Sequence, residues 1–387
     1  MVTLRPHQQR LKEQDPDHAL LVHEMRTGKS IIGKNWTESK KRNKNAIIVC
    51  IKQNKTDWVN LCPDANVYTK EEFKKHWNHI ENPSCILVDE AHNFAAPLYV
   101  PKKRSQLAES LFNFIKKHNK IHVLLLTATP LTNDPASLHT LMTYIGEYVD
   151  WKKFQAAYYD YKHMPFLAYP TWFPKKDWRA MANEVLKRRA DIVSLSDCVD
   201  SLPNETHEII KVRPGKFNYK EDEDYHWTKE HMAEQYNKLP EIKKIGEGYR
   251  KVILVCHYTE QILELKKKLE KHKPVFVLNG QTKNADQVKK QAQAAEDCYF
   301  IVQAKMGMGW DGYMFGCMVF VSLAHRQIDY TQMLGRLTSV DHQKPLVYYT
   351  MIGGKWDKLI YDTLVSGEDF NPHKHGSATP AKKTKTN

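Results

Sequence analysis

Residue types that act on phosphate groups occur early in the chain. The segment Glu24–Ser30 ends in Gly28-Lys29-Ser30 and runs into the apolar pair Ile31-Ile32. A glycine here lets backbone N–H groups approach phosphate oxygens, the lysine reaches the β- and γ-phosphates, and the hydroxyl binds Mg²⁺. The glycine that usually opens such a loop is replaced by His23, so a surface turn with the same letters stays an alternative.

Two adjacent acids follow the apolar run Ile86–Val88, about 60 residues after the Gly-Lys-Ser triplet, in Asp89-Glu90-Ala91-His92. A carboxylate at the end of a buried strand can hold Mg²⁺, and its neighbour can orient and deprotonate an attacking water. A third segment, Leu124–Pro130, places Thr127 and Thr129 just past another apolar run. Hydroxyls in that position can couple the phosphate state to nearby segments.

Short apolar runs bounded by polar or turn residues predict the elements that position these groups. Runs of four to six apolar residues are typical of strands buried on both faces of a parallel sheet. The runs are Ala46–Cys50, Cys85–Val88, His122–Leu126, Val252–Cys256, Pro274–Leu278, Tyr299–Val302, Met318–Ser322 and Leu346–Thr350. Helical patterns lie between them, as at 105–117 and 260–272, so the alternation predicts an α/β fold.

The predicted strands form two groups, 46–126 and 252–350, which predict two domains. Between them lies a stretch rich in aromatic and charged residues that we expect to be mostly helical or irregular. We therefore predict a first lobe over 1–140, a helical insertion and linker over 141–210, and a second lobe over 211–370. The remaining segment 371–387 has almost no large apolar residue and predicts a disordered basic tail.

The chain of 387 residues carries 58 basic and 45 acidic side chains, a formal charge of +13 that favours a polyanionic partner. The charge is shared, because residues 1–210 carry 30 basic and 24 acidic groups and residues 211–387 carry 28 and 21. No uncharged apolar run has the length of a membrane helix, so no membrane partner is expected. The seven cysteines are scattered, which favours a reducing, cytoplasmic environment.

These motifs, in this order, resemble those of superfamily two helicases and translocases. The resemblance is strongest to small viral and phage members related to the Swi/Snf-type DNA translocases, and it spans residues 4–336. The matching segments are Leu4–Gln8 (adenine recognition), Glu24–Ser30 (motif I, the Walker A loop), Asp89–His92 (motif II, the DEAH box), Thr127–Thr129 (motif III), Val252–Tyr258 (motif IV), Lys305–Asp311 (motif V) and Gln332–Arg336 (motif VI).

The resemblance implies two RecA-like parallel-sheet lobes in tandem, with an ATP cleft between them and ATP and Mg²⁺ as cofactors. It implies catalytic roles for Lys29, for Glu90 as the group that activates water, and for Arg336 as an arginine finger. Ser30 and Asp89 would bind Mg²⁺. The nucleotide contacts that it implies are Arg5, Gln8, Thr27, Gly28, Lys29, Ser30, Gly309, Asp311, Gln332 and Arg336.

The resemblance also implies a nucleic-acid track at the carboxyl ends of the strands. Its expected backbone contacts are Lys52, Gln281, Thr282, Gln303 and Lys305. DNA in single-stranded, duplex or branched form is the expected partner, and RNA is less favoured. A monomer in the cytoplasm, the host cytoplasm for a viral protein, is expected, with partners in replication, recombination or repair.

Two departures from the family pattern keep alternatives open. Arg26 stands where the Swi/Snf pattern usually has glycine, and Ser339 replaces the last arginine of motif VI. The main hypothesis is an ATP-hydrolysing DNA helicase or translocase that moves on or remodels duplex or branched DNA. The alternatives are an attenuated protein that binds or anneals nucleic acid with ATP as a switch, and an RNA helicase.

Overall fold

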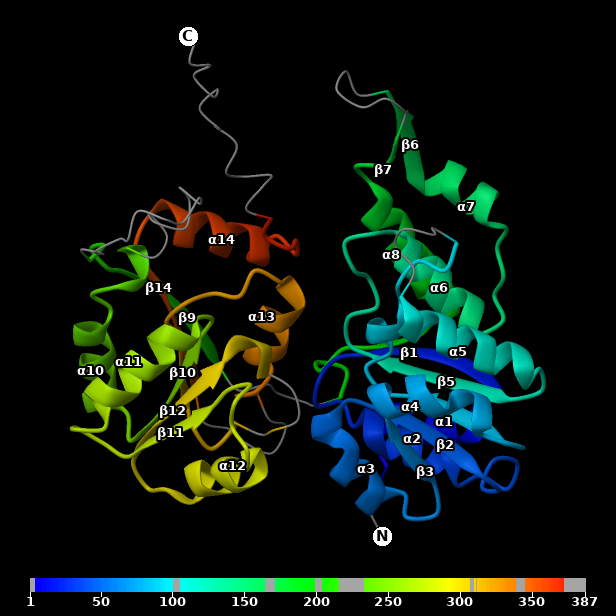
Figure 1. Cartoon of the computed structure of the whole chain (residues 1–387), viewed down its shortest axis with the longest axis horizontal. Coiled ribbons are helices and arrows are strands. Elements are labelled where there is room, and N and C mark those ends of the chain that lie inside the picture. The colour runs from blue at the N-terminus through cyan, green and yellow to red at the C-terminus, as the bar shows by residue number, and fades with distance from the viewer. Residues whose placement is uncertain are drawn as a thin grey trace, which may run out of the picture. The chain divides into compact units, whose positions relative to one another are not determined.

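The computed structural model describes residues 4–99, 105–163, 171–198, 204–215, 233–306, 310, 312–338 and 345–371. The chain divides into two compact units, Met1–Ser201 and Leu202–Asn387. Each unit is built on a six-stranded sheet whose described strand pairs are all parallel, with helices on its faces (Figure 1). This confirms the predicted α/β class with two parallel-sheet lobes in tandem.

The first sheet has the strand order β3-β2-β4-β5-β1-β8. Its strands are β1 (His18–His23), β2 (Ala46–Cys50), β3 (Asn66–Thr69), β4 (Cys85–Val88), β5 (His122–Thr127) and β8 (Asp191–Val193). In register, Val22 lies opposite Thr127, and Val88 lies opposite Leu125. Because the strands are parallel, the segments that follow β1, β4, β5 and β8 all leave the sheet at one edge.

Helices cover both faces of this sheet, because alternate side chains of each buried strand are apolar on both sides. On one face Ile86 and Val123 pack in a cluster with Phe73 and Phe114, and on the other Leu87 packs in a cluster with Trp58. The helices are α1 (Pro6–Gln14), α2 (Lys29–Thr37), α3 (Lys55–Leu61), α4 (Lys70–His76), α5 (Gln106–Lys117), α6 (Ala136–Tyr144), α7 (Trp151–Tyr158) and α8 (Trp178–Arg189).

The segment predicted as a helical insertion, 141–210, contains more strand than expected. It holds α7 and α8, but also the antiparallel pair β6 (Tyr159–Lys162) and β7 (Thr171–Pro174). Its strand β8 belongs to the first sheet, and β9 (Glu205–Lys211) belongs to the second. The stretch therefore combines two helices with short strands, and its description as a helical insertion and linker stays a prediction. The domain borders at 140 and 210 stay predictions.

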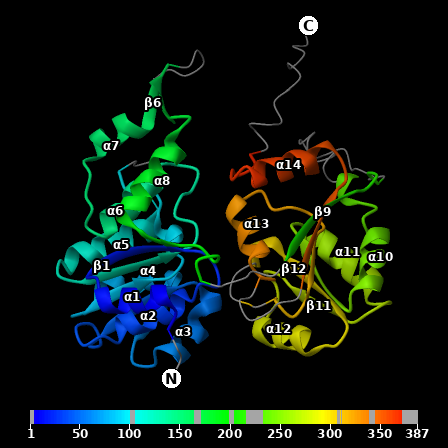
Figure 2. The ribbon, with the colours of Figure 1, turned by 180° about the vertical axis from the view of Figure 1, so that it is seen from behind.

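The second sheet has the order β11-β12-β10-β13-β14-β9. Figure 2 shows its strands β9, β11 and β12 from behind. Its other strands are β10 (Lys251–Cys256), β11 (Val275–Leu278), β12 (Cys298–Gln303), β13 (Cys317–Phe320) and β14 (Leu346–Ile352). The helices of this unit are α10 (Leu239–Gly248), α11 (Thr259–Leu269), α12 (Ala285–Ala294), α13 (Gln327–Leu334) and α14 (Lys355–Val365). Two apolar clusters, one around Ile253 and Phe300 and one around Leu254 and Ile301, lie on opposite faces.

All eight predicted apolar runs form strands, and the predicted helices 105–117 and 260–272 correspond to α5 and α11. Strands β1, β3, β8 and β9 were not predicted. Among the described residues, every helix is too short or too polar to cross a bilayer. Apart from Asn371, the predicted tail 371–387 lies outside the described residues.

Candidate functional site

The loop between β1 and α2 has the backbone that a phosphate-binding loop needs. Gly28 is the N-cap of α2 with φ 85°, and a Cβ there would collide with the Gln8 side chain. Arg26, at the position where the family pattern has glycine, also has a positive φ of 69°. Left-handed residues turn successive N–H groups toward one side of a loop, which makes an anion-binding concavity at a helix N-terminus. The loop thus keeps a glycine-like conformation despite its arginine.

Side chains of the loop are held by its own carbonyl groups. The Lys29 ammonium donates to the carbonyl oxygens of His23 and Glu24 at 2.7 and 2.8 Å. The buried Thr27 hydroxyl donates to the Glu24 carbonyl at 2.8 Å. Ser30 lies exposed in the first turn of α2. The lysine and the serine hydroxyl are therefore at the helix N-terminus, where both would meet a phosphate group.

Helix α1 packs its N-terminus on this loop. The Arg5 guanidinium donates to the Arg26 carbonyl at 3.1 Å, and a ring nitrogen of His7 lies 2.9 Å from the Thr27 carbonyl oxygen. The Gln8 amide donates to the Gly28 carbonyl at 3.3 Å, while its oxygen accepts from the Arg5 N–H at 2.9 Å. The predicted residues Arg5 and Gln8 thus lie beside the loop, although Gln8 precedes Gly28 by 20 residues in the sequence.

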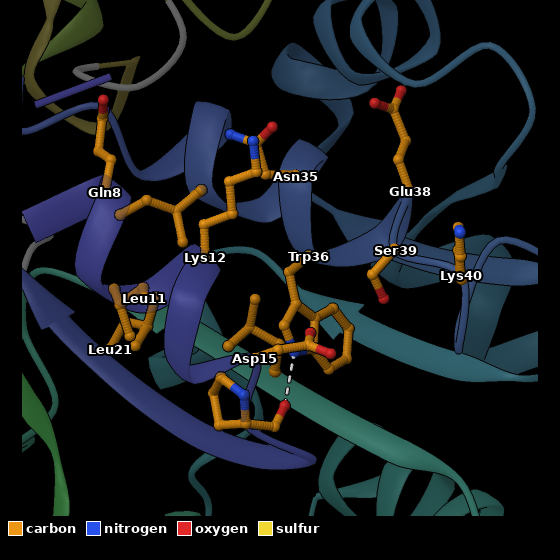
Figure 3. A pocket seen from close by; sticks show the side chains of 13 residues that line it. Gln8, Leu11, Lys12, Asp15, Leu21, Asn35, Trp36, Glu38, Ser39 and Lys40 are labelled. Carbon is orange, nitrogen blue, oxygen red and sulfur yellow. Dashed lines mark hydrogen bonds between the residues drawn. The ribbon is translucent and has the colours of Figure 1, made fainter.

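A cavity of about 400 Å³ lies between α1 and α2, with Gln8 in its lining (Figure 3). Its wall includes the apolar side chains of Leu11, Leu21 and Ile32 and the indole of Trp36. The Trp36 N–H donates to the Pro16 carbonyl at 2.8 Å, which fixes the indole. Cavities of this size with mixed walls accommodate a small organic ligand.

A segment far along the chain closes the other side of the loop. Asp191, the first residue of β8, accepts from His23 at 2.6 Å and pairs with Arg10. The Glu24 carboxylate accepts from the N–H of Leu195 at 2.7 Å. The ends of β1 and of α1 are therefore tied to β8 on the same sheet edge.

Asp89, directly after β4, is buried and aimed by three hydrogen bonds. Its Oδ2 accepts from the Trp58 indole at 2.9 Å and from the Asn54 amide at 3.0 Å, and its Oδ1 accepts from the Glu90 N–H at 3.0 Å. Burial raises the pKa of the Asp89 carboxyl, and the charge of Glu90 raises it further. Hydrogen bonds from Trp58 and Asn54 and the charge of Lys29 offset part of that rise.

Replacing Asp89 with asparagine should stabilise the unliganded protein by about 1 kcal/mol at neutral pH, because a buried charge is removed while an oxygen acceptor remains. A raised folded-state pKa gives stability that is present below the ordinary aspartate pKa of about 4 and lost as the pH rises through the folded-state value. The gain should therefore shrink as the pH falls toward 4. Urea unfolding of both proteins between pH 4 and 8 measures this, and an equal or less stable variant at pH 7 contradicts it.

Glu90 is linked to the end of β5 through His92. The Nδ1 atom of His92 lies 3.3 Å from the Glu90 carboxylate and 3.3 Å from the Thr127 hydroxyl. That hydroxyl in turn accepts from the N–H of Thr129 at 3.1 Å. Glu90 itself has a left-handed backbone, with φ 51°. The segments after β4 and β5 thus form one hydrogen-bonded group beside Asp89.

In the second unit, the predicted nucleic-acid contacts after β11 and β12 lie at one sheet edge. The Gln303 side chain accepts from the Gly280 N–H at 3.2 Å and donates to the His257 carbonyl at 3.5 Å. The Thr282 hydroxyl donates to Asn279 in the same loop as Gln281. Lys305 is exposed just beyond β12. Lys52 belongs to the first unit, where it is exposed after β2 in the turn that ends with Asn54.

Gln332 lies in the last turn of helix α13, and Arg336 comes shortly after the helix ends at Leu334. The Arg336 guanidinium donates to the carbonyls of Trp310 and Gln332 at 2.9 and 3.3 Å, so the predicted motifs V and VI touch here. Gln332 is buried. The predicted residues Gly309 and Asp311, and Ser339, lie outside the described residues.

The sequence did not predict the residues that hold Asp89 and the loop after β1 in place. Trp58 and Asn54 orient Asp89, and Asp191 and Leu195 hold the loop after β1. These residues carry no motif, and their partners are distant in sequence. The signal for His92 was present, because it belongs to the Asp-Glu-Ala-His segment.

No family model and no curated protein matches this chain. Among solved structures, the chain is similar to the SWI2/SNF2 ATPase core of Sulfolobus solfataricus, determined in complex with dsDNA. The sequence identity is 13%, the match covers 94% of this chain and 91% of that chain, and the TM-score is 0.43. A likeness at this level does not assign a function, so the functional argument rests on the residues above.

Proposed function

We propose that the chain is a nucleic-acid-dependent ATPase that acts on DNA as a translocase or helicase. The observation that carries the proposal is the grouping of Lys29, Ser30, Asp89 and Glu90 beyond the carboxyl ends of strands of one parallel sheet. A phosphate-binding loop, a cation-binding carboxylate and a second carboxylate at one edge are the parts that nucleotide hydrolysis needs. The ordered motifs over residues 4–336 support the same activity.

In this proposal the N–H groups at the start of α2 and the Lys29 ammonium bind the phosphates. Arg5 and Thr27 hold the loop through its carbonyl groups. The cavity lined by Gln8 is the proposed place for the adenine ring, since it combines the indole of Trp36 with polar side chains.

The residues present fit a magnesium ion held by Asp89 and the Ser30 hydroxyl together with phosphate oxygens. Oδ1 of Asp89 accepts one hydrogen bond that the structure shows, so it keeps a lone pair for the cation or one of its waters. Magnesium in ATPase sites is commonly bound by one or two carboxylates plus substrate phosphates. The described residues contain no cluster of three or more histidine, cysteine or acidic groups that would cage a metal alone. When bound, the cation would neutralise the charge of the phosphates.

Glu90 is the proposed base that orients water and takes its proton, with His92 and Thr127 as positioning residues. Arg336 is the proposed arginine finger, and Gln332, Gly309 and Asp311 are proposed nucleotide contacts, all on the resemblance of motifs V and VI. Lys52, Gln281, Thr282, Gln303 and Lys305 are the proposed phosphate-backbone contacts. The charge of +13 supports an anionic partner of this kind.

The test is ATP hydrolysis by the purified full chain, alone and with single-stranded DNA, blunt duplex, forked duplex and RNA of matched length. We expect DNA to stimulate the rate of ATP hydrolysis, because the proposed motor couples hydrolysis to nucleic-acid binding. Raising the salt concentration should remove the stimulation, since the contacts are to phosphates.

If no nucleic acid changes the rate while ATP binds, the proposal of a motor is wrong and a nucleotide-switched binding protein is correct. If RNA stimulates hydrolysis far more than any DNA, the DNA assignment is wrong.

A further inference from the structure

The antiparallel pair β6–β7 carries two aromatic rings on its exposed surface. Tyr161 and Trp172 are register partners, with ring centroids 4.8 Å apart. They are 59% and 40% exposed. In Figures 1 and 2, β6 lies beyond α7, away from the strands of the first sheet. Two neighbouring exposed rings offer aromatic surface on which a base can stack.

Three aromatic residues of α7 and α8 are buried, unlike Tyr161 and Trp172. Phe154, Tyr158 and Trp178 are buried in the apolar cluster of the first unit. The aromatic-rich stretch therefore separates into a core that holds α7 and α8 together and an exposed pair that this core does not use. Packing in the core explains the first group, whereas the second group adds one cross-strand ring contact to β6–β7 and leaves much of its ring surface exposed.

The segments that contain the exposed pair, together with the helices on either side of it, are strongly basic. Residues 151–163 and 171–189 contain nine lysines and arginines and three aspartates and glutamates. Lys152, Lys153 and Lys176 are exposed, and no carboxylate lies in ion-pair contact with them among the described residues. Aromatic rings flanked by lysines are the combination that binds unpaired nucleic acid, because bases stack on the rings and phosphates meet the charges.

The base of this pair is attached to the segment that follows β5. The Tyr159 hydroxyl accepts from the N–H of Ala136 at 3.1 Å and donates to Asp134. The Arg179 guanidinium donates to Asn133 at 3.3 Å. These residues follow directly on Thr127–Pro130, whose threonine is bonded to His92. The pair β6–β7 is thus anchored to the loop that leads from β5 to α6.

We propose that β6–β7 is a contact site for single-stranded nucleic acid, in which Tyr161 and Trp172 stack on bases while Lys152, Lys153 and Lys176 contact phosphates. The proposal rests on the proposed function and deepens it, because it names unpaired strand as the part of the substrate that this element binds.

The test compares the parent with the double variant Tyr161→Ala/Trp172→Ala by fluorescence anisotropy on a labelled oligothymidylate and on a blunt duplex. We expect affinity for the single strand to fall about 5-fold to over 100-fold, from the loss of stacking on one or two bases. Affinity for the duplex and ATP hydrolysis without nucleic acid should stay unchanged. Tyr148→Ala, which removes a ring that is 62% exposed elsewhere in the unit, is the matched control and should bind like the parent.

A second variant tests the charges without touching the rings. Lys152→Gln/Lys153→Gln/Lys176→Gln should reduce the slope of log affinity against log salt by about 2 for the single strand, at about 0.7 per phosphate contact. Equal single-strand affinity of the parent and the ring variant, with both melting at the same temperature, overturns the proposal. If the rings do not affect single-strand affinity but DNA stimulates hydrolysis by the parent, the proposed function still stands. If the rings are needed for single-strand binding but DNA does not stimulate hydrolysis by the parent, only the proposal of a motor is overturned.

Discussion

Replacing Glu90 with glutamine should lower the rate of ATP hydrolysis about 10²- to 10⁴-fold, the usual contribution of a positioned general base. The amide keeps the size of the side chain beside His92, whose Nδ1 lies 3.3 Å from the Glu90 carboxylate, but it cannot take a proton. Nucleotide binding should persist, because the loop after β1 and Asp89 are unchanged. Stopped-flow binding of a fluorescent ATP analogue and single-turnover hydrolysis measure the two effects separately.

The matched control is Glu81→Gln, a change of the same kind at an exposed position shortly before β4. It should hydrolyse ATP at the parent rate. Single-turnover rates within twofold of the parent for Glu90→Gln would show that another group activates the water. A loss of nucleotide binding would show instead that Glu90 acts in binding.

Replacing Lys238 with methionine should destabilise the second unit by about 3–5 kcal/mol, the usual cost of leaving one member of a buried ion pair alone. The Lys238 ammonium donates to Asp357 at 2.7 Å and to the carbonyl of Val321 at 2.7 Å, and both charged side chains are 1% exposed. Burial lowers the pKa of Lys238, and the charge of Asp357 opposes that shift. Asp357 also accepts from the Gly353 N–H at 2.9 Å, so the pair joins α14 to the ends of β13 and β14.

Urea unfolding followed by circular dichroism measures this change. Lys244→Met, at an exposed position of the same helix α10, should alter stability by less than about 0.5 kcal/mol. The double variant Lys238→Met/Asp357→Leu should recover part of the loss, since no buried charge is then left without its partner. If the single variant is as stable as the parent, the pair does not hold this unit together.

The strands that the sequence predicts are those buried on both faces. A run such as Ile86–Val88 has no polar residue, and both sheet faces are covered at that point. The edge strand β9 is mostly exposed, and β8 has three residues, so neither produces an apolar run. An edge strand forms because it pairs with residues far away in the sequence, and a local sequence pattern carries no information about that pairing.

The candidate site is predicted in the same uneven way. The sequence identifies Lys29 and Asp89, because each belongs to a short motif. Loop geometry and charge depend on neighbouring residues, which such a motif contains. The Trp58 indole that orients Asp89 comes from a helix whose own sequence indicates only an apolar contact. The antiparallel pair β6–β7 lies in the stretch expected to be mostly helical or irregular, since aromatic residues give no sign of whether a ring will face water.

The place of β8 in the first sheet has a consequence for synthesis of the chain. Its residue Asp191 is 168 positions beyond His23, its partner at the end of β1. At roughly 5–20 residues per second, a ribosome needs about 10–30 s to make the intervening chain. During that time one edge of β1 has no strand beside it, and open strand edges invite pairing with other chains. The side of β1, the strand that leads into the phosphate-binding loop, is thus the last part of the first sheet to be covered as the nascent chain emerges.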